Sequence, residues 1–422
     1  MRFRLCLNLA IAILVSLIGV QSASFAGAAS RQGFFTGHVR TFGSHHIRIQ
    51  QPAPVQAVPT VNVRDFGATG NGVTDDTGAI QNAIAAAQAA GKGVLFPAGN
   101  YLHNNIITAN GVGLFGVGAA SVLVAGSTTN TAVILTGVNP SIQNLVINTQ
   151  FVSTVGLNPV DPNKPCLTIK DSQGFVVQGI AILQGNAHTG VLLLQSAVGQ
   201  VSSVAIFGGG GPVDDGILMD RCANVSIVGN AISNVDGGIS VGLLVGSVSQ
   251  SIAVMGNAIS SHSSAIQLFN VNIADCEQNQ LQVSSPVSTA VFVGGILNNF
   301  SVTNNLVLSA GIGINIQNTA GSGGVVTQNV IQNCAQEGIV DVTVPFGGGV
   351  QLIGNKFGEC GTVSNTPVIL VNAGGGPDSV VVLNNVYSGH ANLLTFFIST
   401  IGHVNVVSGN AQTQTVLTNN LP

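Results

Sequence analysis

Apolar and polar positions recur in two parallel series along most of the chain, with a spacing of about 25 residues. In the first series, an Asn or a small residue precedes an apolar pair, at Asn144, Gly179, Ser203, Asn230, Asn257, Asn279, Asn305, Asn329, Asn355, Asn385 and Asn410. The second series begins apolar strands at Leu167, Val191, Ile217, Ile239, Ile266, Val291, Ile314, Ile339 and Val368. Two series in step predict an all-β solenoid in which each coil buries its apolar side chains against its neighbours.

Residues 61–101 predict a different element, a short amphipathic helix between two strands. Apolar residues fall at i, i+3, i+4 and i+7, which gives one narrow apolar face (Ile80, Ala83, Ile84 and Ala87). Thr74, Asp75 and Asp76 precede this helix as candidate N-cap acceptors, and Gly91 ends it. A helix this short cannot bury its face alone, so we expect it to cover the first coil.

The same stretch carries a recognisable motif. It begins with Asp65-Phe66-Gly67-Ala68, continues through Asp75-Asp76-Thr77, and ends with Pro97-Ala98-Gly99. This motif resembles the N-terminal signature of the pectate-lyase-like superfamily, of the rhamnogalacturonase and epimerase type. The resemblance implies a right-handed parallel β-helix, here of about 11 coils, capped by an N-terminal α-helix. The superfamily includes hydrolases, lyases, epimerases and inert members.

The N-terminus is typical of an exported protein. Arg2 and Arg4 precede an apolar run over residues 5–20, and small residues follow. We predict a signal peptide over residues 1–26, a flexible linker over 27–58 and the β-helix domain over 59–422. The mature protein is then secreted or held in the cell envelope, with no membrane segment after signal cleavage.

Composition narrows the range of partners. Charged residues make up 6% of the chain, which has 11 basic and 15 acidic residues and a net charge of −4. A chain so poor in Lys and Arg is unsuited to nucleic acid, which needs phosphate-neutralising side chains. An extracellular polysaccharide that is neutral or weakly acidic fits better. The sequence does not determine the oligomeric state.

Two cysteines are expected to stack. Cys334 and Cys360 each follow an Asn of the first series, Asn329 and Asn355, by five residues. Their positions on adjacent coils are then about one strand spacing apart. That distance is compatible with a disulfide and equally with two stacked thiols.

A stripe of ionisable residues precedes the strand starts. His188, Asp214 and Asp236 all lie three residues before a strand start; Asp215 lies two before and His262 four before. Equal offsets on adjacent coils are about 4.8 Å apart, so these side chains are predicted to be neighbours. Like charges at that distance favour one protonated and one ionised carboxyl, the pair that glycoside hydrolysis requires. We therefore predict a catalytic group made of Asp214, Asp215, Asp236 and His262.

A second set of residues is predicted to bind substrate beside this stripe. Its members are outward-facing or adjacent to it by their offsets: His188, Lys170, Asp220, Arg221, Phe269 and Phe292. Because the chain has no Trp, Phe269 and Phe292 on adjacent coils are the candidate platform for sugar rings.

The stripe also resembles the site of the polygalacturonase-type enzymes. Asn234-Val235-Asp236-Gly237 is similar to their Asn-x-Asp-Gly element and Asp214-Asp215-Gly216 to their Asp-Asp element, here in the reverse order. The resemblance implies hydrolysis by paired aspartates, with His262 alongside. For this reaction we expect no cofactor or metal.

Two other interpretations remain open. The acidic residues are also suited to hold Ca²⁺, with Arg221 or Lys170 removing a proton in a polysaccharide lyase. Alternatively, Asp and Gly at coil corners are turn formers. The protein is then a non-catalytic solenoid that binds glycans or builds the envelope.

Overall fold

The computed structural model describes most of the chain from residue 58 onward: residues 58–126, 133–150, 161, 164–185, 189–210, 215–242, 248–296, 298–320, 323–341, 349–361, 368–373, 380–388, 396–400, 404–408 and 415–418. The predicted signal peptide and nearly all of the predicted linker lie outside these residues, as do His188, Asp214 and Asn410. No helix among the described residues has the length and apolar character needed to cross a membrane.

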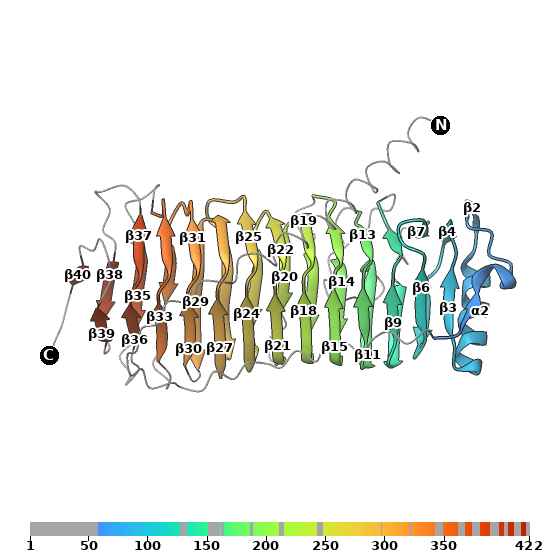
Figure 1. Ribbon diagram of the computed structural model, residues 1–422, viewed down its shortest axis with the longest axis horizontal. Helices are drawn as coiled ribbons and strands as arrows, with labels where there is room; N and C mark the ends of the chain where they lie inside the picture. Colours follow the sequence, from blue (N-terminus) through green and yellow to red (C-terminus); the bar gives the residue numbers. More distant parts are fainter. Residues whose placement is uncertain are drawn as a thin grey trace, which may run out of the picture. The chain divides into compact units, whose positions relative to one another are not determined.

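The described strands form a right-handed parallel β-helix, as predicted, with three strands in a typical coil (Figure 1). We name the three faces after the strands of one coil. The β19 face is a 13-stranded parallel sheet, and the β17 and β18 faces together form a 27-stranded sheet. Each strand pairs with its counterparts one coil before and one coil after, so residues about one period apart become neighbours.

The β17 face leads each coil and contains β5 (Ile107–Asn110), β8 (Val133–Val138), β11 (Leu167–Gln173), β14 (Thr189–Leu194), β17 (Asp215–Asp220), β20 (Gly237–Val241), β23 (Ile266–Phe269), β26 (Thr289–Ile296), β29 (Ile312–Ala320), β32 (Ile339–Asp341), β35 (Ile369–Ala373), β38 (Phe396–Thr400) and β40 (Thr415–Thr418).

The β18 face follows it with β1 (Thr60–Asn62), β3 (Gly93–Phe96), β6 (Gly113–Gly116), β9 (Ser141–Gln143), β12 (Val176–Gln178), β15 (Ala197–Ser202), β18 (Ala223–Val228), β21 (Gln250–Met255), β24 (Ile273–Glu277), β27 (Asn299–Thr303), β30 (Gly324–Thr327), β33 (Val350–Ile353), β36 (Val380–Leu383) and β39 (Val404–Ser408).

The β19 face closes each coil with β2 (Asn71–Asp75), β4 (Gly99–His103), β7 (Ser121–Ala125), β10 (Val146–Asn148), β13 (Ala181–Leu183), β16 (Ala205–Phe207), β19 (Ala231–Val235), β22 (Ala258–Ser261), β25 (Gln280–Val283), β28 (Leu306–Ser309), β31 (Val330–Gln332), β34 (Lys356–Gly358) and β37 (Val386–Ser388).

The predicted strand starts are in register on the β17 face. Successive partners in the pairing are Leu167, Val191, Ile217, Ile239, Ile266, Val291, Ile314 and Ile339. All of them are fully buried, because they point into the shared core. The last predicted start is wrong by one residue, since Ile339 pairs with Ile369 and not with Val368.

A ladder of buried asparagines runs along the corner between the β18 and β19 faces, and Asn305 is a representative member. Its Nδ2 donates to the Cys276 carbonyl at 2.9 Å and to Asn329 Oδ1 at 3.0 Å. Its own Oδ1 accepts from the backbone and side-chain nitrogens of Asn279. The predicted stacking is therefore confirmed for Asn230, Asn257, Asn279, Asn305, Asn329, Asn355 and Asn385.

The first three members of the predicted series are not part of this ladder. Asn144, Gly179 and Ser203 have left-handed backbones, with φ between 53° and 61°, and lie one residue before the ladder position. The pairing of β10, β13, β16 and β19 places Leu145, Ile180 and Val204 at the position of Asn230. The predicted alignment was wrong there because the left-handed corner residue, which is often Gly or Asn, directly precedes the ladder residue.

The N-terminal helix α2 (Thr77–Ala90) covers the first coil, as predicted, and follows the short 3₁₀ helix η2 (Val63–Phe66). Its buried residues are the four that were predicted, and Gly91 ends it in the left-handed conformation. Asp75 accepts from the Thr77 N–H at 3.0 Å. Asp76 differs from the prediction: its carboxylate binds the N–H groups of Thr69 and Gly70 and so holds the preceding turn instead of the helix.

The five cysteines of the described residues are free and buried, including the stacked pair Cys334 and Cys360. The hydrogen bond between these two thiols, together with burial, raises the pKa of Cys334. The pair is therefore present as stacked thiols and not as a disulfide.

One buried imidazole lies beneath the helical cap. His103 ends β4 with no exposed surface, and its Nδ1 lies 3.0 Å from the Asn105 carbonyl. Burial lowers the pKa of His103, and the Asn105 carbonyl and Asp75 only partly oppose this. No hydrogen-bond partner for its Nε2 is present among the described residues.

We predict that Asn305→Ala lowers the free energy of unfolding by about 2–4 kcal/mol, because the buried backbone N–H of Asn279 and the Cys276 carbonyl lose the hydrogen bonds that Asn305 provides. Urea denaturation followed by circular dichroism measures the change. Asn299→Ala is the matched control, since Asn299 is exposed. Equal effects from the two substitutions would contradict a stabilising role for the ladder.

We also predict that His103 makes the free energy of unfolding decrease as the pH is lowered. A histidine whose folded pKa is lowered stabilises the fold above its unfolded pKa of about 6.5, and this stabilisation is lost as the pH falls below that value. As the pH is lowered from about 8 to about 5, a range that brackets this pKa, the melting temperature should decline more in wild type than in His103→Gln. Parallel pH profiles would show that another group is responsible.

Candidate functional site

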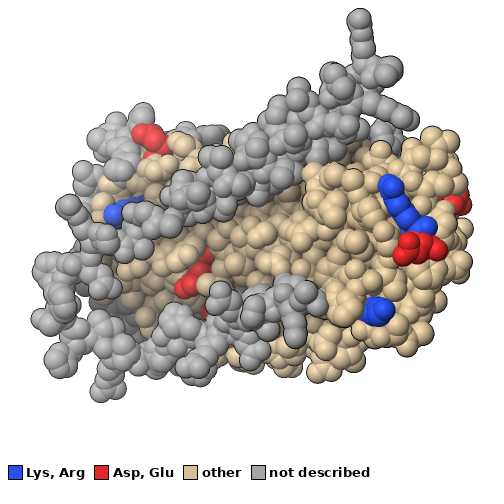
Figure 2. Space-filling view, turned by 45° about the vertical axis from the view of Figure 1, so that its right-hand side comes forward, with Lys and Arg blue, Asp and Glu red and all other residues tan. Residues whose placement is uncertain are grey.

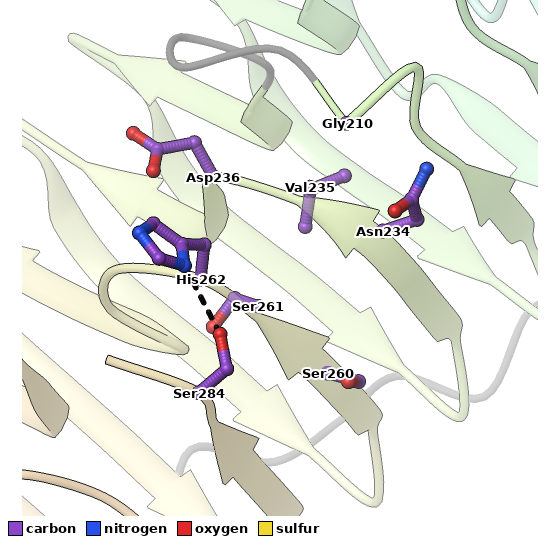
Figure 3. A pocket seen from close by; sticks show the side chains of 8 residues that line it. All are labelled: Gly210, Asn234, Val235, Asp236, Ser260, Ser261, His262 and Ser284. Atoms are coloured by element: carbon purple, nitrogen blue, oxygen red, sulfur yellow. Dashed lines mark hydrogen bonds between the residues drawn. The ribbon is translucent and has the colours of Figure 1, made fainter. Parts of the chain in front are cut away.

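A surface pocket of ≈ 630 Å³ opens at the corner where the β19 face leads into the β17 face (Figure 3). We call this corner the site corner; it comprises the pocket residues and Asp215. The pocket is lined by residues of four successive coils: Gly210, Asn234, Val235, Asp236, Ser260, Ser261, His262 and Ser284. Two of the predicted catalytic residues, Asp236 and His262, are therefore in one pocket.

Backbone hydrogen bonds explain why Asp236 and His262 are close. The His262 N–H donates to the Val235 carbonyl at 2.9 Å, and the Ser263 N–H donates to the Asp236 carbonyl at 2.8 Å. The parallel pairing of β19 with β22 thus continues through the turns that follow these strands. As a result, the turn that carries His262 lies directly beside the turn that carries Asp236.

Serine hydroxyls orient both functional groups. Ser263 Oγ donates to Asp236 Oδ1 at 2.9 Å, and His262 Nδ1 lies 3.1 Å from Ser284 Oγ. Figure 3 shows the Asp236 and His262 side chains projecting to the same side from adjacent turns. His262 is exposed and Asp236 partly exposed, so a ligand can reach both. Asn234 lies on the other side of the pocket, where its Nδ2 donates to the Gly208 carbonyl at 2.7 Å.

Asp215 adjoins Asp236 on the preceding coil. It begins β17, is partly exposed and pairs with Gly237, the residue after Asp236. A Cβ at position 237 would lie 2.3 Å from Asp215 Oδ1, so the carboxylate occupies the space that the glycine leaves. Asp215 and Asp236 therefore occupy neighbouring backbone positions at the site corner.

The following glycine turns Asp215 outward. A Cβ at Gly216 would lie 2.6 Å from Cγ2 of the core residue Ile232, so position 216 faces the interior. Ile217 faces the core as well, which interrupts the alternation of inward and outward positions at the start of the strand. Simple counting back from Ile217 would have placed Asp215 on the inner side.

The other predicted polar residues lie at the far end of the same face. Lys170 and Asp220 are in register two coils apart, both as partners of Leu194. Asp220 is buried, and its Oδ2 accepts from Arg221 Nε at 2.8 Å. Lys170 Nζ lies 3.8 Å from Asp171 Oδ2. Asp220 is five positions along the strand from Asp215, a distance of about 17 Å. The predicted stripe is thus two separate groups.

Phe269 and Phe292 form a stacked pair on the β17 face, with ring centroids 6.5 Å apart and an angle of 30° between the rings. Both are partly exposed. Of the remaining predicted residues, His188 and Asp214 lie outside the described residues.

Sequence reasoning missed the two serines that orient the site. Ser263 has the same offset before Ile266 as Asp236 has before Ile239, and this register was a usable signal for it. Ser284 follows β25, whose start was not aligned with the catalytic offsets, and only the structure reveals its contact with His262.

Charge is sparse on the face shown in Figure 2, where the described acidic and basic side chains form small separate groups. Among the described residues, no three His, Cys, Asp or Glu side chains gather in a way that could hold a metal ion. The described part of the site corner supplies two carboxylates, an imidazole and serine hydroxyls.

The part of the chain that builds this site matches a known protein family. A family model, rhamnogalacturonase A/epimerase, pectate lyase-like, matches residues 60–284. The chain belongs to this family. The matched residues extend from the helical cap to Ser284 and include Asp215, Asp236 and His262. The predicted superfamily is confirmed.

Curated relatives match over a much shorter stretch. Mannuronan C5-epimerase AlgE1 of Azotobacter vinelandii is 66% identical over 41 residues, which are 10% of this chain and 3% of that protein. AlgE4 of the same organism is 61% identical over 41 residues, 7% of its length. The chain thus matches only a small part of these relatives.

Solved structures share the fold at low sequence identity. PfbA, a surface adhesin of Streptococcus pneumoniae, superimposes with a TM-score of 0.65 at 16% identity, over 81% of this chain and 91% of that one. The catalytic unit of a GH87 α-1,3-glucanase from Streptomyces thermodiastaticus gives 0.54 at 17% identity, over 78% and 70%. These similarities concern the fold alone.

Proposed function

We propose that the protein is a glycoside hydrolase that cleaves a polysaccharide outside the cytoplasm, with Asp215 and Asp236 as the reacting carboxyl pair. The observation that carries this proposal is the pairing of Asp215 with Gly237, which brings two partly exposed carboxylates to neighbouring positions on adjacent coils. Membership of a family named for a rhamnogalacturonase supports a polysaccharide substrate.

The two carboxyl groups divide the reaction between them. One donates a proton to the departing glycosidic oxygen, and the other attacks or stabilises the anomeric carbon. Water, deprotonated by the first carboxylate, then bonds to the anomeric carbon, which releases the sugar and restores both carboxyl groups. Asp236 is suited to the second role, because the Ser263 hydroxyl fixes its Oδ1. Asp215 then serves as the acid. Asp236 is one coil across and one residue along from Asp215, which puts their backbone positions about 6 Å apart. This is nearer to the carboxyl spacing of about 5–5.5 Å that retains the anomeric configuration than to the middle of the wider range that inverts it.

His262 contributes as a polar neighbour of Asp236. Its ring is exposed in the pocket and held through Nδ1 by Ser284, so Nε2 is the nitrogen directed at a ligand. An imidazole in this place can hydrogen-bond a sugar hydroxyl or relay a proton to solvent. Its removal should weaken turnover less than removal of either carboxylate.

A second candidate function is glycan binding without cleavage. The observation that favours it is the Phe269–Phe292 stack, a partly exposed aromatic surface on the same face of the solenoid. Rings of this kind bind sugars in enzymes and in non-catalytic proteins alike. A measurement of activity on polysaccharides separates the two functions.

We predict that the wild-type protein releases reducing ends from at least one of four polymers: polygalacturonate, rhamnogalacturonan, mannuronan and α-1,3-glucan. Asp236→Asn and Asp215→Asn should each lower kcat by about 10²–10⁴-fold, the usual contribution of an acid or base. Asp65→Asn, an exposed carboxylate at the N-terminal cap, is the control and should be fully active.

Other products would contradict hydrolysis. Unsaturated sugar ends, detected by ultraviolet absorbance, would show a lyase. Altered sugar configuration without chain cleavage, detected by NMR, would show an epimerase. Binding with no change to any polymer would favour the non-catalytic function.

We further predict that Gly237→Ala lowers kcat about tenfold or more while the melting temperature changes little. The new methyl group would displace the Asp215 carboxylate, whose Oδ1 lies 2.3 Å from the place that the methyl carbon would take, and the end of a side chain moves at low cost. Gly78→Ala is the matched control, because a Cβ there meets no atom within 4 Å. Full activity in Gly237→Ala would show that the position of Asp215 is unimportant.

A further inference from the structure

We propose that Phe269 and Phe292 form a distal sugar-stacking subsite for a neutral hexopyranose polymer that also occupies the site corner. This inference rests on the proposed function, in which Asp215 and Asp236 are the carboxyl pair that reacts with the polymer. It goes beyond that function by naming the substrate class and the minimum reach of the substrate along the β17 face.

The aromatic pair is presented to solvent by the register of two adjacent strands. Phe269 is the last residue of β23, and Phe292 lies in β26, opposite Gln267. The residues that flank Phe292, Val291 and Val293, are fully buried, so Phe292 points away from the core. The near-parallel rings therefore give one continuous apolar surface across two coils.

A glycine makes room for this arrangement. Gly294 is the partner of Phe269 in the pairing of β23 with β26. A Cβ at position 294 would lie 2.7 Å from Phe292 Cε1 and 3.3 Å from Phe269 Cδ2. Because that side chain is missing, both rings lie close to the sheet beside the glycine. Any larger residue at position 294 would push the rings apart.

The pair lies on the same face as the reacting carboxylates, at a distance that a polymer can span. Asp236 precedes β20, and Ser240 of β20 pairs with Gln267, which pairs with Phe292. Phe292 is thus four residues along the strand and two coils across from Asp236, about 13 Å and about 10 Å. Several sugar rings are needed to connect the two places, and the partly exposed Gln267 lies between them as a hydrogen-bonding side chain.

The chemistry of the two places favours a neutral sugar. Aromatic rings bind the apolar face of a pyranose, and neither Phe269 nor Phe292 offers a partner for a carboxylate. At the site corner, none of the described residues that line the pocket is a Lys or Arg that could pair with the carboxylate of a uronate. A neutral hexose polymer satisfies both conditions, whereas polygalacturonate carries a charge on every residue.

The test is a binding measurement on polysaccharide-loaded gels, with galactan, mannan and α-1,3-glucan as neutral polymers and polygalacturonate as the acidic one. Wild type and Asp236→Asn should both be retained by at least one neutral polymer. Phe269→Ala and Phe292→Ala should each weaken that retention about tenfold, which corresponds to loss of one stacking contact. Phe207→Ala, an exposed Phe on the β19 face, is the matched control and should bind as wild type does.

Chain length provides the second measurement. Hexasaccharides of the retained polymer should compete about tenfold less well for Phe292→Ala than for wild type, and disaccharides should compete equally for both. Phenylalanine-dependent binding without cleavage would uphold the subsite while the hydrolase proposal fails. Cleavage with unchanged binding in both Phe variants would overturn the subsite alone. Preference for polygalacturonate, or equal loss in Phe207→Ala, would also overturn it.

Discussion

The hydrogen bonds of the asparagine ladder are the constraint on which the rest of the structure depends. Each amide from Asn230 to Asn355 binds both a carbonyl of the preceding coil and the amide of the following one, with Nδ2–Oδ1 distances of 2.9–3.0 Å. These groups are buried, so a coil that slipped by one residue would leave several donors and acceptors unpaired. The ladder therefore fixes which residue of each coil lies at this corner, and with it the register of the strands on either side.

The site corner is a direct consequence of that fixed register. Asp215, Asp236 and His262 are far apart in the sequence, yet successive coils place them side by side. Small residues at the turn complete the arrangement, because Gly216 fills the crowded inner position and Gly237 leaves space for the Asp215 carboxylate. The same face then leads from the carboxylates to the aromatic pair within two coils. A chain with few charges thus concentrates its reactive groups at one corner.

Much of the fold was predictable from the sequence, because buried strand starts and asparagines repeat with the coil. The β17 face was aligned correctly from Leu167 to Ile339, and the buried face of α2 was identified in full. The errors occur where adjacent positions have similar preferences. Ser203 was taken for a ladder residue because the left-handed corner residue directly precedes that position. Asp76 was expected to cap the helix, but a buried carboxylate binds any N–H groups within reach, here those of a turn.

The sequence predicted the site only where strand register alone determines which residues are neighbours. Offsets brought Asp236 next to Asp215, but they also joined Asp220 and Lys170 to the same stripe, although strand length separates the two groups.

The direct measurement of the central claim is a double-mutant cycle on the polymer that wild type cleaves. If Asp215 and Asp236 act as one unit, Asp215→Asn/Asp236→Asn will be about as slow as the slower single variant. Rate losses that multiply in the double variant would contradict the account, because they would mean that the two carboxylates act independently.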